Sequence, residues 1–178
     1  MKIRLASILT DSIVDGPGLR TVIFTQGCKH GCLGCHNAQT WSFSGGFETD
    51  TAEILNQLLT SSNRNVTFSG GDPFFQAEAC AEIASVLRDH GFNLWAYTGF
   101  TISALLNSKD VAMHRFLETL DVVVDGLFVL KLKSYSTPYR GSSNQRLIDV
   151  QATLSQHTII DFLPENKEVQ PSKSHLFI

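Results

Sequence analysis

The chain has 178 residues, of which 43% are hydrophobic and 17% are charged, and its net charge at pH 7 is −3. This length suits one domain with a sizeable core. The small net charge, with no block of like charges, argues against binding to nucleic acid or to a charged membrane surface. No stretch is apolar and long enough to be a signal peptide or a membrane span, so we expect a cytoplasmic protein.

The N-terminal third is predicted to contain two strands, a loop and a helix. Residues 2–9 and 21–25 have the β-branched and apolar residues that are typical of strands. Residues 42–48 are rich in Ser, Gly and Phe, and we expect them to form a loop. Asp50 stands where a helix cap is needed, and Glu53 would complete a capping box. The stripe of apolar residues on this helix would be Ala52, Leu55, Leu58 and Leu59.

The middle of the chain alternates between strands and helices. Strands are predicted at residues 65–68, 94–97 and 122–124, and helices at 76–88 and 101–119. The run of three valines at 122–124 is typical of a strand that is buried on both faces of a parallel sheet. The alternation therefore predicts an α/β fold built from parallel βαβ units.

The C-terminal part has a weaker pattern. Residues 147–150 and 158–162 are predicted strands, whereas residues from 163 onward are polar and include two prolines. We expect a single domain over residues 1–162 and a mobile tail over residues 163–178.

Three cysteines, Cys28, Cys32 and Cys35, directly follow the strand at 21–25. In a reducing compartment such a cluster predicts metal ligands rather than disulfides. Cys80 is far away on a predicted helix, in line with its apolar stripe, so we expect it in the core. Three thiolates leave one iron of a four-iron cluster without a protein ligand, and an open coordination position indicates a metal site that does chemistry.

Other interpretations of the cysteines remain open at this stage. Zinc would be bound with His30 or His36 as the fourth ligand, or the loop would hold no metal. Zinc fingers usually place the second pair of ligands further along the chain, which favours the iron–sulfur cluster. Glycines at 27, 31 and 34 favour a tight loop whose backbone lies close to a metal or its ligand.

Three further segments each follow a predicted strand directly: Ser69-Gly70-Gly71-Asp72, Thr98-Gly99 and Asp125-Gly126. The carboxyl ends of parallel strands lie at one edge of a sheet, so we expect these segments and the cysteine loop to surround one site. The Gly-Gly pair would allow close approach of a small cofactor, and the Asp would accept a hydrogen bond from an ammonium group. Alternatively, the Gly-Gly pair forms only a turn between strand and helix, and Thr98 belongs only to the N-cap region of the next helix.

The cysteine spacing resembles the signature of the radical S-adenosylmethionine superfamily. The sequence Val-Asp-Gly-Pro-Gly-Leu-Arg at 14–20, together with Cys35-His36-Asn37 and Thr40-Trp41, is similar to the glycyl-radical-enzyme activases. The segments 68–73, 95–99 and 124–126, with Arg-Gly-Ser-Ser-Asn-Gln at 140–145, resemble the branch that activates anaerobic ribonucleoside-triphosphate reductase. The resemblance covers about residues 12 to 150.

Two positions depart from the broad superfamily and resemble this narrower branch. Gly34 replaces a residue that is often aromatic, and Asp72 replaces a common Glu. The resemblance implies an incomplete, open radical SAM β/α barrel with mostly parallel strands, in which a side stays open for a partner. It also implies a [4Fe-4S] cluster on the three cysteines and S-adenosylmethionine as cofactor. The residues expected to contact S-adenosylmethionine are Gly34, Cys35, His36, Ser69, Gly70, Gly71, Asp72 and Thr98.

The implied reaction begins with an electron from a reduced flavodoxin-like donor, which cleaves S-adenosylmethionine into methionine and a 5′-deoxyadenosyl radical. That radical would take a hydrogen atom from a glycine of the partner, the anaerobic ribonucleoside-triphosphate reductase. No general acid or base is required. Three alternatives stay open: an activase of another glycyl-radical enzyme such as pyruvate formate-lyase, a non-catalytic zinc-binding module, and an electron carrier, which would normally have four protein ligands to its cluster.

Overall fold

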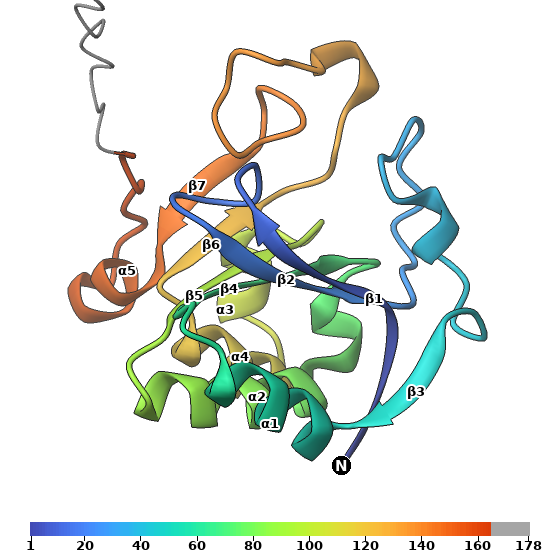
Figure 1. The fold of residues 1–178 in the computed structure, drawn as a ribbon. Helices are drawn as coiled ribbons and strands as arrows, with labels where there is room; N and C mark the ends of the chain where they lie inside the picture. Colours follow the sequence, from blue (N-terminus) through green and yellow to red (C-terminus); the bar gives the residue numbers. More distant parts are fainter. Residues whose placement is uncertain (165–178) are drawn as a thin grey trace, which may run out of the picture.

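Seven strands form one open sheet in the computed structural model, which describes residues 1–164 (Figure 1). The strand order is β3-β1-β2-β4-β5-β6-β7. The strands are β1 (Lys2–Ser12), β2 (Arg20–Thr25), β3 (Phe47–Asp50), β4 (Asn65–Gly70), β5 (Asn93–Tyr97), β6 (Val122–Asp125) and β7 (Arg146–Asp149). The helices are α1 (Thr51–Thr60), α2 (Ala77–Asp89), α3 (Ile102–Leu106), α4 (Val111–Thr119) and α5 (Val150–Gln156), with short 3-10 turns η1 (Ala38–Thr40), η2 (Pro73–Gln76) and η3 (Leu130–Leu132).

The four central strands, β2, β4, β5 and β6, pair in parallel. At the two sides, β1 pairs antiparallel with β2 and β3, and β7 pairs antiparallel with β6. Only β1 and β7 therefore run against the direction of the other five strands. The expected α/β fold, an incomplete and open β/α barrel with mostly parallel strands, is confirmed as an open seven-stranded sheet.

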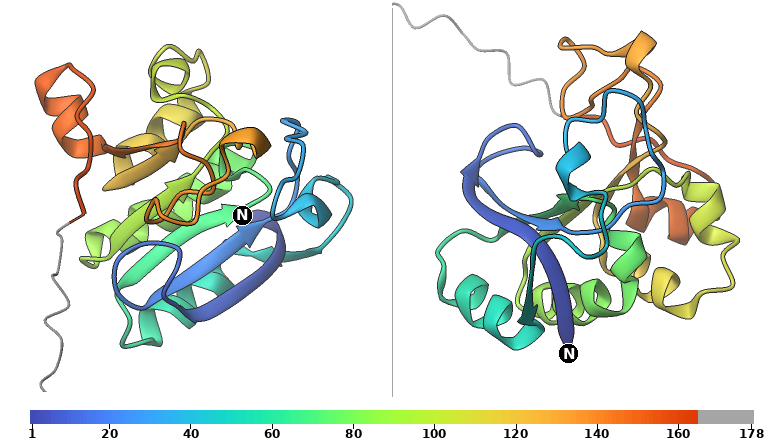
Figure 2. Two further views of the ribbon diagram at one scale, coloured as in Figure 1. Left: turned by 90° about the horizontal axis from the view of Figure 1, so that it is seen from above. Right: turned by 90° about the vertical axis from the view of Figure 1, so that its right-hand side faces the viewer.

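Helices α1 to α4 cover one face of the sheet, and long loops lie on the other (Figures 1 and 2). The core between the sheet and these helices includes Phe68, Ile83, Leu87 and Val123, all fully buried. Cys80 belongs to the same core and has no exposed surface, which confirms the prediction made from its helical spacing. Burial raises the pKa of the Cys80 thiol.

A second, smaller apolar cluster lies on the opposite face of the sheet. It contains Trp95, Val122, Val124 and Leu147. Successive side chains of a strand point to opposite faces, so Val123 faces the helices while its two neighbours face this cluster. Burial on both faces explains why β6 is a continuous apolar run.

The region before α1 differs from the prediction. Residues 47 and 48 were expected in a loop, but they belong to β3, whose Thr49 pairs with Ile3 of β1. Asp50 is the cap residue of α1, yet the predicted capping box is wrong. The Asp50 carboxylate accepts a bond of 2.8 Å from Lys2 Nζ, and Glu53 binds the Thr49 hydroxyl.

The predicted apolar stripe of α1 is correct only in part. Leu58 is buried, and Leu55 and Leu59 are half-buried against the core. Ala52 is exposed, and Ile54 occupies the buried position instead. Because Ile54 and Leu58 are four residues apart, they lie on one face of the helix, one turn after the other.

Two later predictions also need correction. The helical region expected at 101–119 is two helices, α3 and α4, and α4 has its own cap because Ala112 N donates to the Asp110 side chain at 2.9 Å. The expected strand at 158–162 does not form; Asp161 makes only an isolated bridge to Ile148 of β7.

The predicted mobile tail at 163–178 lies outside the described residues from position 165 onward. The division of the chain at residue 162 therefore stays a prediction. Among residues 1–164, the helices are all too short or too polar to cross a membrane.

Arg20 at the start of β2 is a fully buried cation. Its guanidinium donates to Thr67 Oγ1 at 2.7 Å, to the Val66 carbonyl at 2.8 Å and to Asn93 Oδ1 at 2.9 Å, and it lies 5.2 Å from the centre of the Trp95 ring. Burial lowers the pKa of Arg20 to about 10, so it remains charged at neutral pH. Arg20 thereby joins the start of β2 to β4 and β5.

The substitution Arg20→Lys should lower the free energy of unfolding by about 2–4 kcal/mol, because a lysine cannot reproduce the planar set of donors and leaves buried acceptors without partners. Urea unfolding followed by circular dichroism measures the change. Arg64→Lys is the matched control: this exposed arginine lies over Phe92, and its loss should stay within about 0.5 kcal/mol. Equal losses in the two variants would contradict a special role for Arg20.

Candidate functional site

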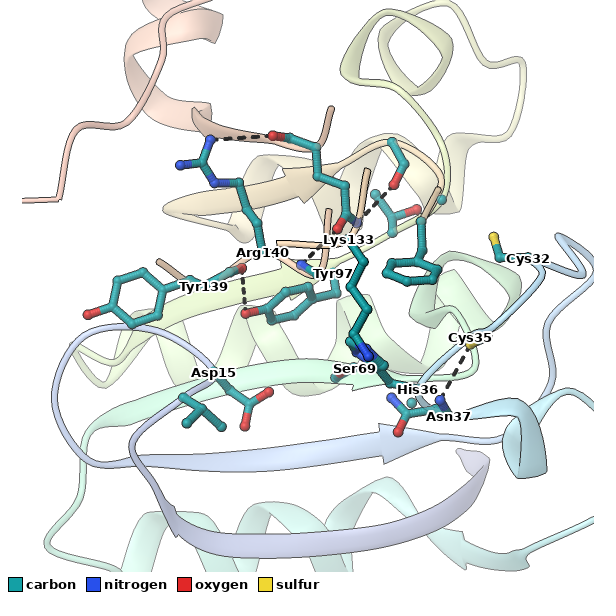
Figure 3. Close-up of a pocket in the computed structure, with 18 of the residues that line it drawn as sticks. Asp15, Cys32, Cys35, His36, Asn37, Ser69, Tyr97, Lys133, Tyr139 and Arg140 are labelled. Atoms are coloured by element: carbon teal, nitrogen blue, oxygen red, sulfur yellow. Dashed lines mark hydrogen bonds between the residues drawn. The ribbon is translucent and has the colours of Figure 1, made fainter. Parts of the chain in front are cut away.

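A cavity of about 530 Å³ lies at the carboxyl ends of the central strands (Figure 3). Its lining includes Cys28 after β2, Ser69 and Gly70 at the end of β4, Thr98 after β5 and Gly126 after β6. The expectation that four loops meet at one rim is confirmed. The reason is topological, since parallel neighbours end at the same edge of the sheet.

The cysteine loop is fastened to the rest of the fold at its base. Gly27 N donates to the Thr40 carbonyl at 2.7 Å, and Cys28 N donates to the Trp41 carbonyl at 3.0 Å. Within the loop, Cys35 N donates to the Cys32 carbonyl at 3.1 Å. Gly27, Gly31 and Gly34 all have positive φ angles, as expected for a loop that turns tightly.

Cys28, Cys32 and Cys35 are all free, half-buried and part of the cavity lining. Burial raises the pKa of the Cys28 and Cys32 thiols, although a backbone N–H of Phe128 partly opposes this at Cys32. Among the described residues, no three His, Cys, Asp or Glu side chains are grouped as a site for a single metal ion. In a [4Fe-4S] cluster each cysteine binds a different iron, so the three thiols need not converge on one point.

The end of β4 lies in direct backbone contact with the start of the cysteine loop. Gly71 N donates to the Thr25 carbonyl at 2.7 Å, and Asp72 N donates to the Gly27 carbonyl at 3.0 Å. A Cβ atom on Gly71 would lie 2.3 Å from the Gly27 oxygen. Only glycine allows this approach, which makes the Gly-Gly pair a structural requirement as well as a wall of the cavity.

Two of the predicted contact residues are absent from the cavity lining. Asp72 is 1% exposed, and its carboxylate accepts bonds from His30 Nε2, Thr98 Oγ1, Gly99 N and Phe74 N at 2.7 to 3.0 Å. Gly34 is also outside the lining, and a Cβ there would lie 2.8 Å from Leu130 Cδ1. Contacts of Asp72 or Gly34 with a cofactor stay predictions.

The other predicted contact residues lie at the cavity. Cys35, His36, Ser69, Gly70, Gly71 and Thr98 are all part of its lining. His36 packs against Phe128, with 5.0 Å between the ring centres. The Thr98 hydroxyl is already engaged, since it donates to Asp72 Oδ2 and accepts from Phe100 N.

A long segment, residues 127–145, connects β6 to β7 (Figure 1). It forms another wall of the cavity, to which Lys133, Tyr139 and Arg140 contribute (Figure 3). The Gln145 side chain links the two ends of this segment. Its Oε1 accepts from Gly141 N at 3.0 Å and from Ser142 N at 3.2 Å, and its Nε2 donates to the Gly126 carbonyl at 3.0 Å. Tyr97 OH donates to the Tyr139 carbonyl at 2.9 Å and ties the segment to β5.

Comparison with known proteins gives concordant results. Residues 14–148 match the family model described as a 4Fe-4S single cluster domain. The chain is 34% identical over 143 residues to the anaerobic ribonucleoside-triphosphate reductase-activating proteins of Salmonella typhimurium and of Escherichia coli K12, an alignment that covers 75% of this chain and 90% of each relative.

The chain belongs to the family of anaerobic ribonucleoside-triphosphate reductase-activating proteins. It is also 36% identical over 126 residues to the pyruvate formate-lyase-activating enzyme of Clostridium pasteurianum, which covers 67% of this chain and 52% of that enzyme. Among solved structures it is similar to QueE from Escherichia coli, with a TM-score of 0.48, 18% identity and coverage of 57% and 54% of the two chains.

The cavity lining also contains residues that were not predicted to contact a cofactor. They include Asp15, Tyr97, residues 133–135 and 137–141, and also His30, which was considered only as an alternative zinc ligand. The signal for some of them was present, because the similar stretches at 14–20, 95–99 and 140–145 include Asp15, Tyr97 and Arg140. No comparable pattern in the sequence marks the segment around Lys133.

The close approach at the end of β4 predicts unequal costs for two glycine substitutions. Gly70 and Gly91 both have positive φ, but a Cβ on Gly70 would lie 2.4 Å from the Thr25 carbonyl oxygen, whereas nothing lies within 4 Å of one on Gly91. Gly70→Ala should therefore cost about 2–5 kcal/mol of unfolding free energy, from left-handed strain and overpacking together. Gly91→Ala should cost only the strain, about 1–2 kcal/mol. Denaturant titration that gives equal values would show that the contact with Thr25 relaxes freely.

Proposed function

We propose that this chain is a radical S-adenosylmethionine activating enzyme that generates a glycyl radical on anaerobic ribonucleoside-triphosphate reductase. The observation that carries the proposal is the set of three free cysteines on one cavity, in a chain that belongs to the activating-protein family. When bound, a [4Fe-4S] cluster and S-adenosylmethionine supply the electron-transfer and hydrogen-abstraction chemistry. The protein's part is to hold, orient and enclose them.

The chemistry of the donors suits a cluster with one iron that has no protein ligand. Cys28, Cys32 and Cys35 would hold three irons, and their thiols are accessible from the cavity. Cys80 cannot supply a fourth thiolate from its fully buried place in the helical core. The free coordination position then suits a small chelating ligand, as in other open metal sites.

The cavity also suits a ligand of the size of S-adenosylmethionine, since small-molecule sites commonly have volumes of about 300–1,000 Å³. Its polar wall, formed by Ser69–Gly71 and Thr98, lies next to the cysteine loop and would receive the methionyl end. Val14 and Tyr97 give apolar and aromatic surface for the adenosyl end. Asp72, which is outside the lining, would act by fixing this wall in place.

The finer features of the proposal concern the donor and the compartment. We infer a reduced flavodoxin-like protein as the electron donor and a cytoplasmic location, without nucleic acid or membrane as partner. The use of clustered cysteines as metal ligands fits a reducing compartment, where thiols do not form disulfides. The small net charge of −3 is consistent with the absence of a nucleic-acid partner.

Pyruvate formate-lyase is the second candidate partner, because one relative at 36% identity is named as its activating enzyme. That relative is longer, and the chain spans only 52% of it, whereas it spans 90% of the reductase-activating relatives. We therefore favour the reductase.

Anaerobic reconstitution tests the proposed chemistry directly. The protein is supplied with iron and sulfide, reduced, and mixed with S-adenosylmethionine, and we expect methionine and 5′-deoxyadenosine as products. Addition of the anaerobic reductase should then give the electron paramagnetic resonance signal of a glycyl radical, and pyruvate formate-lyase should give none. A colourless protein that retains stoichiometric zinc and forms no product would refute the proposal in favour of a structural metal module.

Substitution of single cysteines tests the set of ligands. Cys28→Ala, Cys32→Ala and Cys35→Ala should each abolish S-adenosylmethionine cleavage, because each removes one of only three ligands. Cys80→Ala is the matched control and should retain most of the activity while losing about 1 kcal/mol or more of stability from the small cavity it leaves. An inactive but folded Cys80→Ala protein would overturn the assignment of three ligands.

A further inference from the structure

His30 lies in the cysteine loop, between Cys28 and Cys32, yet its side chain turns toward the ends of β4 and β5. Its Nε2 is 2.7 Å from Asp72 Oδ2, in a hydrogen bond across 42 positions of sequence. The His30 side chain is 16% exposed and forms part of the cavity lining. The residue therefore belongs to the site, although its polar edge is directed to the protein.

Asp72 brings three loops together at one carboxylate. Its Oδ2 accepts from His30 after β2, and from Thr98 Oγ1 at 2.8 Å and Gly99 N at 2.9 Å after β5. Its Oδ1 accepts from Phe74 N at 3.0 Å, at the start of η2 after β4. With 1% exposure, this carboxylate has little access to water, and protein donors satisfy both of its oxygens.

The imidazole ring of His30 also fits its surroundings by shape. The ring centre lies 4.8 Å from that of Phe100 in an edge-on arrangement and 5.3 Å from that of Phe75. A Cβ on Gly99 would lie 2.5 Å from His30 Cδ2, so the ring rests directly on the Gly99 backbone. Packing and a hydrogen bond together thus define the position of the loop between two of its cysteines.

We propose that His30 is a positioning residue that acts through Asp72. It fixes the Cys28–Cys32 part of the loop against the Gly70-Gly71 and Thr98-Gly99 walls, and thereby sets the geometry in which S-adenosylmethionine meets the cluster. Groups that bind the residues around a metal site commonly orient the ligands in this way. The inference rests on the function proposed above, and it assigns to His30 neither a metal bond nor a proton transfer.

Two substitutions separate the hydrogen bond from the ring. His30→Phe keeps an aromatic ring between Phe75 and Phe100 but cannot donate to Asp72. His30→Gln keeps an N–H donor near the place of Nε2 but loses the ring. His90→Gln is the control, because His90 is exposed at the end of α2 and its side chain is hydrogen-bonded to the Val86 carbonyl, away from the cavity.

The measurements use the reconstituted full chain. We expect His30→Phe to keep the iron content of the wild type, while its affinity for S-adenosylmethionine falls about ten-fold, the effect of losing one hydrogen bond to a charged group. The change that S-adenosylmethionine causes in the electron paramagnetic resonance spectrum of the reduced cluster should then require correspondingly more ligand. His30→Gln should recover most of the affinity, and His90→Gln should match the wild type.

Two results would overturn the proposal. One is a folded His30→Phe protein with wild-type affinity and spectrum, and the other is loss of iron from both His30 variants, which would make His30 a holder of the cluster. If His30→Phe does not fold, His30→Asn replaces it, because its shorter amide does not reach Asp72.

A separate experiment distinguishes failure of this inference from failure of the proposed function. In the metal-free full chain, His30→Phe should increase the rate at which iodoacetamide alkylates Cys28 and Cys32 by about ten-fold, because the loop opens more easily. An unchanged rate would refute the positioning role whatever cofactor the protein uses. An increased rate in a protein whose wild type binds no S-adenosylmethionine would support the positioning role and refute only the proposed function.

Discussion

The site depends on one close backbone contact, between the end of β4 and the start of the cysteine loop after β2. Here Gly71 N and Asp72 N donate to the carbonyls of Thr25 and Gly27, so the strand pairing continues past the sheet into the loops. The contact leaves no room for side chains at Gly70 or Gly71. Because of it, the thiols and the polar wall of the cavity belong to one rigid backbone unit instead of two loops that meet by chance.

The two faces of the sheet contribute different parts of the structure around this unit. The helical face supplies the main core, while the opposite face carries Arg20, the Trp95 cluster and the segment 127–145. Gln145 closes that segment through Gly126 and Gly141, and Leu130 from the same segment packs on Gly34 of the cysteine loop. The cysteine loop is thus supported on one side by the strand ends and on the other by a loop that also encloses the cavity.

The sequence was sufficient to predict the central strands and the meeting of four loops at one rim, because apolar runs and the parallel topology determine both. Prediction from the sequence failed where residues that are distant in the sequence bind or pair with one another. The Asp50 carboxylate binds Lys2 instead of forming a capping box, and β3 pairs with β1, which is distant in the sequence. The His30–Asp72 bond joins positions far apart in sequence, and the segment 127–145 has no periodicity to reveal its fold. Local patterns carry no information on such pairings.

The isolation of Cys80 has a consequence for the handling of the protein in air. If the loop cysteines lose their cluster, three thiols become available for oxidation while the fourth stays enclosed in the helical core. An intrachain disulfide uses two of the three, and the remaining thiol has no partner in its own chain. The expected product of such oxidation is a disulfide-linked dimer that a reductant separates into monomers. The linked cysteines should map to residues 28–35.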